Sequence, residues 1–550
     1  MTDGRTGGRL VVDQLRSEGV DTAFCVPGES YLEVLDALHG SGIRLVTCRH
    51  EGGAGYMADA YARITGTVGV ALVTRGPGAA NAAVALHTAW QDSTPLVLLV
   101  GLVPRGQTGR EAFQEFDLQG WFGTTAKAVH RVDDAARVPE LLAGAFATAR
   151  SGRPGPVVVG LPEDVLRERA AVGPVAPVEV TEPVPAPATM ARFAGLVRDA
   201  TRPLVVLGGV GWSPAAADQA RRWAERFALP VAVEFNALDL IDHDSPSYVG
   251  CMGFGRPAEL TSALREADLV IGIGSPLGDV VTDGWELLPV DAPGARLVTV
   301  LPDAEARGSA HPDALRIVAT APAFTAALDD LAAPEDPGWA ERTRLLRKAH
   351  EEWRVPRGRG ADLDLDEVFG QLRDHLPDDA IVTWGAGNHC AWPSRFLSRH
   401  GYPSQLAPRN GSMGYGVPAA VAAAIAHPQR PVVSIAGDGC FLMNGQELAT
   451  ARAQGVAPLV LVLDNGTYGT IRAHQEQRHP GRVSGTDLVN PDFAALVRAY
   501  GGHGETVTRT AEFVPALERA MAAGVPALIA LRVTDGTLAP GVTVADLRAT

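Results

Sequence analysis

The sequence predicts an α/β protein made of three doubly wound domains, each built on a parallel sheet. Short apolar runs bounded by Gly or Pro, which are typical of buried parallel strands, alternate with segments of helical spacing. The 550 residues are too many for one core and suit about three domains. Two segments without helical spacing interrupt the alternation: 172–187 is rich in Pro and Val, and 355–361 is rich in Arg and Gly. We therefore expect domains at 1–171, 190–335 and 362–550.

Charge, cysteine content and the lengths of the apolar runs limit the compartment and the partners. A formal net charge of −15 and a pI near 5.4 argue against nucleic acid or an anionic membrane as the main partner. The five cysteines are scattered without a CxxC pair, so we expect neither a disulfide framework nor a zinc site. Residues 1–10 lack the apolar core of a signal peptide, and apolar runs such as 95–103 are too short to span a bilayer. These observations favour a cytoplasmic protein.

In the first block, a predicted strand end coincides with residues suited to ligand binding. The strand expected at 44–48 is followed directly by His50 and Glu51, and ligand crevices of α/β proteins open at the carboxyl ends of strands. The helix expected at 51–63 has a face of small residues, which allows the close approach of another helix, such as one from a second subunit. The other expected features are a helix at 9–18, a strand at 22–26, a helix at 31–39, a strand at 69–73 leading into the turn 74–81, and a closing apolar run at 155–162.

The middle block repeats these signals, with strands expected at 203–208, 230–234, 269–274 and 296–301. A Gly-rich turn, Gly208-Gly209-Val210-Gly211, follows the first strand but lacks the full GxGxxG spacing of a dinucleotide site. Turns like it are frequent in doubly wound sheets, so this one alone does not predict a bound nucleotide.

The third block carries the most specific pattern in the chain. A strand expected at 431–436 ends in Gly437-Asp438-Gly439, where the glycines allow a tight turn close to a ligand. A helix expected at 443–453 can present its amino end to an anion, and a strand at 457–463 leads to Asn465. A carboxylate and an amide oxygen at neighbouring strand ends suit Mg²⁺ carrying a diphosphate. The alternative is an ordinary βαβ unit with a Gly-rich turn.

Asp438, Asn465 and the spacing between their motifs resemble the diphosphate and metal motif of thiamine diphosphate (ThDP) enzymes. The resemblance covers nearly the whole chain and is closest to the acetohydroxyacid (acetolactate) synthase group. It implies a pyrimidine-binding, a middle and a diphosphate-binding domain, with ThDP and Mg²⁺ as cofactors. In that family the last metal ligand is a backbone carbonyl two residues past the Asn, which falls on Thr467. Asp464 stands where the family usually has Asn, at a position that does not usually bind metal.

The resemblance identifies Glu51 as the catalytic glutamate. In ThDP enzymes this acid holds a proton against N1′ of the pyrimidine, so that the 4′-amino group can deprotonate C2 of the thiazolium. Taken alone, a Glu that opens a helix is more often a partner of the helix dipole. In related enzymes the glutamate serves a cofactor held by the third domain of another subunit. The resemblance therefore implies a homodimer or homotetramer with active sites between subunits.

Two further segments resemble cofactor contacts of the family. Met413, between glycines, matches the apolar wedge that bends ThDP, and the matching Gly411 carbonyl receives the 4′-amino group. Without that match, such a Met would be core filler. Gly385-Ala386-Gly387-Asn388-His389 resembles the Gly-Val-Gly-Gln-His stretch that contacts the diphosphate, with the shorter Asn388 in place of Gln. His389 has an equal alternative as a buried histidine whose hydrogen bonds are satisfied.

The segment around Phe113 and Gln114 bears on the reaction. Ala-Phe-Gln-Glu resembles the synthase stretch whose Phe and Gln approach the reacting intermediate. Simple 2-keto acid decarboxylases carry adjacent histidines near here, and this loop has none, which favours carboligation. Glu29 stands where the synthases usually have Gly, and places a carboxylate near the cofactor. The tryptophan that favours a 2-ketobutyrate acceptor is missing from the segment that begins at Tyr468, which argues against a housekeeping role in branched-chain amino acid synthesis.

The candidate residues fall into three overlapping groups. The catalytic candidates are Glu51, Gln114, Phe113 and Glu29. The cofactor-binding candidates are Gly28, Glu51, Asn81, Gly385, Ala386, Asn388, His389, Gly411, Met413, Gly437, Asp438, Gly439, Cys440, Asn465, Thr467, Tyr468 and Gly469. The metal-ligand candidates are Asp438, Asn465 and Thr467.

The resemblance implies a ThDP-dependent lyase or carboligase that decarboxylates a 2-keto acid and transfers the acyl anion to an acceptor. The alternatives are a non-ligating 2-keto acid decarboxylase, a 2-hydroxyacyl-CoA lyase and, from a different class, a catalytically inactive ThDP-binding regulatory homologue. We expect no tightly bound FAD, because the family's Arg-Phe-Asp-Asp-Arg stretch near the flavin appears here as Ser275-Pro276-Leu277-Gly278-Asp279-Val280. The missing arginines would have supplied fixed hydrogen-bond donors.

Overall fold

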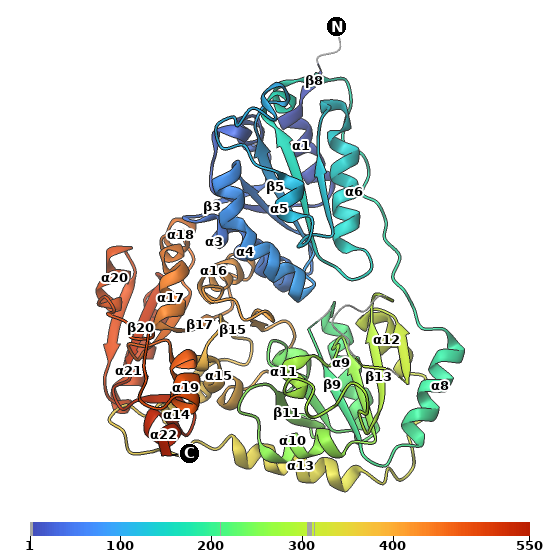
Figure 1. Ribbon diagram of the computed structural model, residues 1–550, viewed down its shortest axis with the longest axis vertical. Helices are drawn as coiled ribbons and strands as arrows, with labels where there is room; N and C mark the ends of the chain where they lie inside the picture. The colour runs from blue at the N-terminus through green and yellow to red at the C-terminus, as the bar shows by residue number, and fades with distance from the viewer. Residues whose placement is uncertain (1–3, 210, 305–310, 313, 550) are drawn as a thin grey trace.

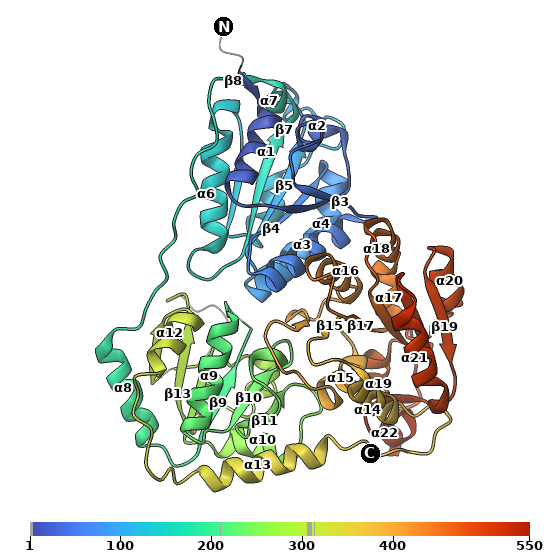
Figure 2. The same ribbon diagram turned by 180° about the vertical axis from the view of Figure 1, so that it is seen from behind.

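Three six-stranded parallel sheets, each covered by helices, form the protein (Figures 1 and 2). The computed structural model describes residues 4–209, 211–304, 311–312 and 314–549. The predicted α/β class with three doubly wound sheets is confirmed. No helix within the described ranges is long and apolar enough to cross a membrane.

The first sheet has the order β3-β2-β4-β5-β7-β6, and every neighbouring pair is parallel. The order reverses between β2 and β4, so the loops that follow these two strands flank a crevice. Its strands are β2 (Thr22–Cys25), β3 (Arg44–Thr47), β4 (Gly69–Val73), β5 (Leu96–Leu102), β6 (Ala128–Arg131) and β7 (Pro156–Pro162). Its helices are α1 (Gly7–Ser17), α2 (Leu32–Leu38), α3 (Glu51–Thr65), α4 (Gly76–Asp92), α5 (Leu118–Phe122), α6 (Val138–Arg150) and α7 (Glu163–Arg167).

The middle sheet has the order β11-β10-β9-β12-β13-β14. The four strands expected in this block are present to within one residue at each end. Of the Gly-rich turn after β9, Val210 lies outside the described residues. The strands are β9 (Pro203–Leu207), β10 (Val231–Glu234), β11 (Tyr248–Met252), β12 (Leu269–Ile273), β13 (Arg296–Leu301) and β14 (Leu315–Val318). The helices here are α8 (Pro187–Arg198), α9 (Pro214–Arg226), α10 (Ala258–Glu266), α11 (Asp279–Thr282), α12 (Ala321–Leu328) and α13 (Ala340–Trp353).

The third sheet has the order β16-β15-β17-β18-β20-β19, with its reversal between β15 and β17. Its strands are β15 (Ile381–Trp384), β16 (Gln405–Leu406), β17 (Val432–Gly437), β18 (Leu459–Asp464), β19 (His503–Val507) and β20 (Ala527–Arg532). Its helices are α14 (Leu365–His375), α15 (Ala391–Phe396), α16 (Gly416–Ala426), α17 (Asp438–Asn444), α18 (Leu448–Gln454), α19 (Gly469–Arg478), α20 (Phe493–Ala499), α21 (Phe513–Ala522) and α22 (Val544–Ala549). Two short antiparallel pairs complete the fold: β1 (Arg5–Thr6) with β8 (Arg169–Ala170), and β21 (Thr537–Ala539) with β22 (Val542–Thr543).

The helix after β17 differs from the expected single helix at 443–453. It begins at Asp438, and a 3₁₀ turn over Gly445–Glu447 separates α17 from α18. Gly437 caps the helix in an extended conformation, and a carboxylate in the first turn of a helix is favoured by the helix dipole. The Asp438 side chain therefore lies at the helix start, one turn earlier than the apolar spacing indicated.

The small-residue face of α3 packs within the same chain. A Cβ atom at Gly53 would lie 2.4 Å from Glu447 Oε1, and one at Gly55 would lie 2.4 Å from Cβ of Ala85. The neighbours of α3 are α4 of the first domain and α16 of the third domain, and α16 lies directly beneath α3 in Figure 1. The expected close approach is therefore seen with α4 and α16 of the same chain.

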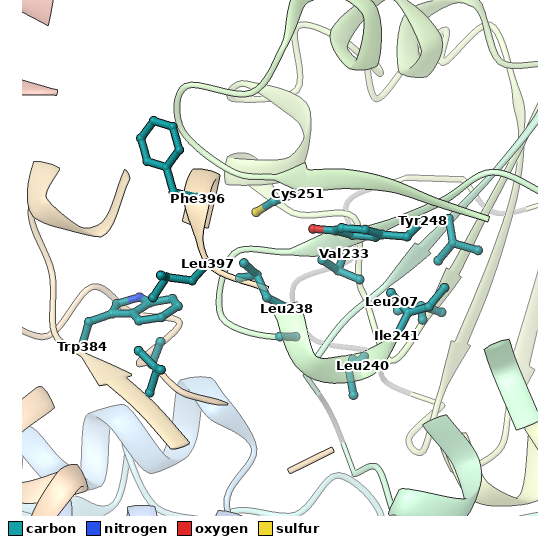
Figure 3. Close-up of a cluster of buried hydrophobic side chains, with 14 of the residues drawn as sticks. Leu207, Val233, Leu238, Leu240, Ile241, Tyr248, Cys251, Trp384, Phe396 and Leu397 are labelled. Carbon is teal, nitrogen blue, oxygen red and sulfur yellow. The ribbon is translucent and has the colours of Figure 1, made fainter. Parts of the chain in front are cut away.

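The middle and third domains share one apolar core. Leu238, Tyr248 and Cys251 lie on the middle-domain side, and Trp384 and Leu397 lie on the side of the third domain (Figure 3). All five side chains are almost fully buried, and burial at about 25 cal/mol per Å² of apolar surface makes this contact a major source of stability. The two domains are therefore held in a fixed relation. The first domain reaches α8 through residues 171–186, which form no helix or strand.

Candidate active site

Glu51 opens α3 at the carboxyl end of β3, as the sequence predicts. His50 caps the helix, because its Nδ1 accepts a hydrogen bond from the Gly52 amide over 3.0 Å. The Asn81 side-chain amide donates to Glu51 Oε2 over 2.9 Å, so α4 fixes the carboxylate from the neighbouring strand connection. A Cβ at Gly78 would lie 3.3 Å from Glu51 Oε1. The Gly78 position thus leaves room for the carboxylate beside the start of α4.

Gly28 and Glu29 follow β2 and lie against the turn that precedes α4. A Cβ at Gly28 would lie 2.5 Å from Thr74 Cβ, so only glycine fits there. Glu29 Oε1 accepts a hydrogen bond from Arg75 Nη1 over 2.9 Å, and Arg75 Nη2 donates to Glu163 over 2.7 Å. Arg75 is buried, and the sequence argument did not single it out. The predicted carboxylate of Glu29 is therefore held by an ion pair.

The segment with Gln114 and Phe113 lies over the same turn, and the two side chains differ in their surroundings. Gln114 has a positive φ of 65° and its carbonyl accepts a hydrogen bond from the Gly76 amide over 3.0 Å. Non-glycine residues with such a φ are uncommon and concentrate at functional sites. Gln114 lines a cavity of about 570 Å³ that Arg75 and His130 also line. Phe113 is 75% exposed and does not line that cavity.

The third domain presents its candidates at four adjacent strand ends. Gly385, Ala386, Asn388 and His389 follow β15, and the segment with Gly411 and Met413 follows β16. Gly437, Asp438, Gly439 and Cys440 lie at the junction of β17 and α17, and Asn465, Thr467, Tyr468 and Gly469 follow β18. These strands are neighbours in the sheet, so the structure brings all of these candidates to one edge.

Asp438 is buried and held by three donors. Its Oδ1 accepts from the Gly439 amide, and its Oδ2 accepts from the Gly466 amide and from Asn490 Nδ2, each over 2.8 Å. Asn490 Nδ2 also donates to Asp464 Oδ1 over 2.7 Å, so one amide bridges both acids. Burial raises the pKa of the Asp438 carboxyl. Across the described residues, no Lys or Arg nitrogen pairs with Asp438.

These observations test whether the site fits a divalent cation. Two buried carboxylates, Asp438 and Asp464, share the neutral donor Asn490, and Arg532 lies 3.5 Å from Asp464. The Asn490 Oδ1 atom is buried without a partner among the described residues. Asn465 Oδ1 accepts a long hydrogen bond, of 3.2 Å, from the Thr467 amide. Buried negative charge with oxygen ligands to spare is the environment that Mg²⁺ requires, so the residues fit.

His389 lies beneath the turn at Gly437. A Cβ at Gly437 would lie 3.1 Å from its Nδ1, and the His389 Nε2 atom is buried without a partner in the described part of the chain. Burial lowers the pKa of His389 to about 4. The histidine is therefore neutral and not satisfied by protein groups, which argues against the alternative expected for it. Next to it, Thr470 Oγ1 donates to Asn388 Oδ1 over 2.9 Å and so fixes the Asn388 side chain.

The segment of Met413 is clamped by α17. Cys440 Sγ accepts a hydrogen bond from the Gly414 amide over 3.2 Å, and Asn444 Nδ2 donates to the Gly414 carbonyl over 3.0 Å. Gly411 and Gly414 both have positive φ, at 66° and 78°. A Cβ at Gly439 would lie 2.5 Å from the Tyr468 ring, so the ring closes over the start of α17.

Another group of potential metal ligands lies away from these strand ends. His400 Nδ1 is 3.1 Å from Asp242 Oδ1 and 3.5 Å from Asp244 Oδ2. Asp244 is largely exposed, and pairs of this kind are ordinary surface ion pairs. We assign it no role in the candidate active site.

Comparison with known sequences identifies the family of this fold. The family model "Thiamine pyrophosphate enzyme, N-terminal TPP binding domain" matches residues 5–121, the central-domain model matches 190–328, and the "C-terminal TPP binding domain" model matches 385–531. Thiamine pyrophosphate is thiamine diphosphate. An acetolactate synthase large subunit of Parasynechococcus marenigrum is 36% identical, over 96% of this chain and 88% of that protein. The chain belongs to the thiamine pyrophosphate enzyme family.

Other members of the family show similar agreement. The acetolactate synthase isozyme 2 large subunit of Escherichia coli is 32% identical over 96% of both chains. The acetolactate synthase large subunit of Corynebacterium glutamicum is 32% identical over 94% of this chain and 84% of that protein. The three family models fall on the three sheets, which confirms the resemblance predicted from the motifs.

Several residues of the site escaped sequence reasoning. Asn490 joins Asp438 to Asp464 from an irregular loop, and nothing in the local pattern distinguishes it from a solvent-exposed Asn. Arg75 sits in the predicted turn before α4, but its pairing with Glu29 crosses between strand ends and has no signal in either segment. Glu447 accepts hydrogen bonds from the Arg49 and His50 amides, each over 3.0 Å, and so ties the start of α3 to the third domain.

Proposed function

We propose that the protein is a ThDP-dependent carboligase of 2-keto acids: it decarboxylates one keto acid and transfers the acyl anion to a carbonyl acceptor, like acetolactate synthases. One observation carries this proposal: 96% of the chain aligns with acetolactate synthase large subunits. The geometry supports it, because Glu51 and Gln114 lie at the start of α4 and Asp438 and Asn465 lie at the strand ends of the third domain.

When bound, ThDP supplies a carbon nucleophile that adds to the keto acid and accepts the charge left by departing CO₂. In this proposal Glu51, oriented by Asn81, holds a proton at N1′ of the cofactor. Asp438, Asn465 and the Thr467 carbonyl would hold Mg²⁺, which would neutralise charge on the diphosphate. Met413 and Gly411 would lie against the cofactor. His389, whose Nε2 has no partner among the described residues, would supply a donor near the diphosphate.

The partition between ligation and simple decarboxylation depends on proton supply. The loop with Gln114 carries no histidine, which supports ligation. However, His130 lines the same cavity as Gln114, and burial lowers its pKa. A histidine there favours a second candidate function, a non-ligating 2-keto acid decarboxylase, because it can return a proton to the reacting carbon.

We further propose a homodimer or homotetramer with the cofactor between subunits and domain limits at 1–171, 190–335 and 362–550. The cavity beside Gln114 is lined by first-domain residues alone, which is what half of a shared site requires. Large apolar side chains also stand exposed near both halves, and such groups gather where another surface covers them. They are Val84, Phe113, Leu442, Met443 and Ile471. A cytoplasmic location accords with the composition.

The decisive experiment supplies the purified protein, ThDP and Mg²⁺ with a panel of 2-keto acids, with and without an aldehyde acceptor, and follows CO₂ and products. Acetoin-type or acetolactate-type products support the carboligase. Aldehyde as the sole product from the parent, together with ligated product from His130→Gln, supports the decarboxylase instead. Cleavage of a 2-hydroxyacyl-CoA without keto acid turnover identifies a lyase. ThDP binding without turnover of any of these substrates leaves a regulatory homologue.

A further inference from the structure

A buried charge network joins the helix of Glu51 to the segment of Met413. Asp59 and Arg63 lie on α3, Asp92 ends α4, and Tyr415 directly precedes α16. Asp59 and Tyr415 are completely buried, and Asp92 is nearly so. The network therefore occupies the contact between the first and third domains.

The hydrogen bonds run continuously across this contact. The Tyr415 hydroxyl donates to Asp59 Oδ2 over 2.8 Å. Arg63 Nη1 approaches Asp92 Oδ2 at 3.2 Å, the Ala407 carbonyl at 2.9 Å and the Tyr415 hydroxyl at 3.3 Å. One guanidinium from the first domain thus holds both ends of the chain that connects β16 to α16.

The same connection is held at three further points. The Arg409 amide donates to Asp92 Oδ1 over 2.7 Å. Asn410 Nδ2 donates to Thr88 Oγ1 over 3.1 Å, and the Thr88 and Ser412 hydroxyls lie 2.9 Å apart. Gly411 and Met413 lie between these anchored residues. Their positions are consequently set by helices of the first domain as well as by α17.

The network holds two buried acids next to cations. Arg63 faces both Asp59 and Asp92, and the positive charge of Arg409 also acts on Asp92. Burial raises the pKa of Asp59, and it raises the pKa of Asp92 to about 7. Although burial by itself lowers the pKa of Arg63, the surrounding Tyr415, Asp92 and Asp59 raise it on balance. These charges are shielded from water, so the network is stable only as an arrangement of specific hydrogen bonds.

We propose that Asp59, Arg63, Asp92 and Tyr415 are positioning residues that place Gly411 and Met413 against the cofactor, an inference that rests on the proposed function. In the proposed dimer, α3 therefore contributes to two active sites. Glu51 at its amino end serves the cofactor of the partner, and its middle turns position the segment that supports the cofactor of its own subunit. Each active site thus depends on α3 of both subunits.

The test compares two tyrosine variants on the intact protein. Tyr415→Phe removes the hydroxyl that bonds Asp59. Tyr61→Phe is the matched control. Tyr61 lies on α3, as Asp59 and Arg63 do, and its hydroxyl donates to the acid Asp21 over 2.8 Å, outside the network. Exchange of the ThDP C2 proton is measured at saturating ThDP and Mg²⁺, together with the melting temperature of the apoprotein.

We expect Tyr415→Phe to slow C2 exchange about tenfold at saturating cofactor, as the loss of one buried hydrogen bond predicts, while Tyr61→Phe exchanges at the parental rate. Equal rates of C2 exchange in the two variants overturn the positioning role of the network, even if both variants have a lower melting temperature. A parent that binds ThDP without exchanging its C2 proton contradicts the proposed function instead, and with it this inference.

Mixed dimers test the link between subunits. One subunit carries Glu51→Gln, which inactivates the active site whose cofactor is held by the third domain of the other subunit. Adding Tyr415→Phe to that same subunit must reduce the remaining exchange about tenfold, because it disturbs the one working site. Adding Tyr415→Phe to the other subunit must leave the remaining exchange unchanged. The reverse pattern overturns the assignment of each α3 to two cofactors.

Discussion

The side-chain amide of Asn81 donates a hydrogen bond of 2.9 Å to Glu51 Oε2. The donor comes from the first turns of α4 and the acceptor from the first residue of α3, so the bond joins two strand connections of one sheet. It leaves Glu51 Oε1, beside Gly78, as the oxygen free to meet a ligand.

Glu51→Gln is expected to bind ThDP nearly as the parent does and to slow exchange of the C2 proton by orders of magnitude. The amide can still accept the Asn81 hydrogen bond but cannot hold a transferable proton. Proton exchange followed by NMR measures this. Glu140→Gln, at a half-exposed position on α6, is the control and must keep the parental rate. Parental exchange in Glu51→Gln would remove this residue from the mechanism.

Asp438→Ala is expected to abolish Mg²⁺-dependent binding of ThDP. The change removes a buried carboxylate and leaves the Gly466 amide and Asn490 without their acceptor, so the diphosphate loses its metal. Titration calorimetry with and without Mg²⁺ measures the effect. Asp374→Ala, an exposed acid on α14, is the control. Unchanged affinity in Asp438→Ala contradicts the metal assignment.

Asp92→Asn is expected to flatten the dependence of stability on pH. The pKa of Asp92 is raised to about 7 by burial, and Arg63, Asp59, Arg409 and Tyr415 are the charged or titratable groups that interact with it. The folded protein therefore retains a proton that the unfolded chain releases near pH 4.

The sign follows from this difference in bound protons. A raised carboxyl pKa stabilises the fold most below pH 4, and the free energy of unfolding falls as pH rises towards 7, by at most about 1.4 kcal/mol per unit. Urea unfolding between pH 5 and 8 measures the slope. The slope should be smaller in Asp92→Asn and unchanged in Asp374→Asn. Identical slopes in all three proteins would show that Asp92 is ionised when folded.

The purified protein is expected to carry no tightly bound flavin. At the strand ends of the middle domain, the buried Glu234 accepts a hydrogen bond from Ser275 over 2.5 Å. Arg409 of the third domain lies 3.7 Å from this carboxylate and is already paired with it, and the arginines of the family stretch are replaced. The absorption spectrum of fresh protein after gel filtration provides the test. A flavin band nearly stoichiometric with subunits contradicts the prediction.

Strand ends were predictable because their signal is local. Glu51 and Asp438 each follow a short apolar run directly, and the parallel topology then places them in crevices. The helix start at Asp438 was missed because Leu442 and Met443 are exposed, so α17 does not show the apolar spacing of a buried face.

The contacts across domains had no such signal. Asp59 and Arg63 occupy a helix in which a polar pair four residues apart indicates a solvent-exposed face. Their burial depends on α16, which is more than 350 residues away along the chain. Asn490 reaches two acids from an irregular loop, and only the folded chain brings these groups together. Such pairings depend on tertiary packing, which periodicity does not record.

The packing of α3 on α16 also bears on how this chain can be recombined with its relatives. Gly53 leaves room for the Glu447 side chain, and Arg63 donates a hydrogen bond to the Ala407 carbonyl. The two complementary surfaces are therefore encoded before and after the middle domain in the sequence. A chimera that exchanges only the first domain would separate residues that must match in shape and charge. Crossover points that transfer the first and third domains together, leaving the middle domain native, preserve those matches. Substitutions at the contact between α3 and α16 must therefore be matched in two segments of the gene that lie far apart.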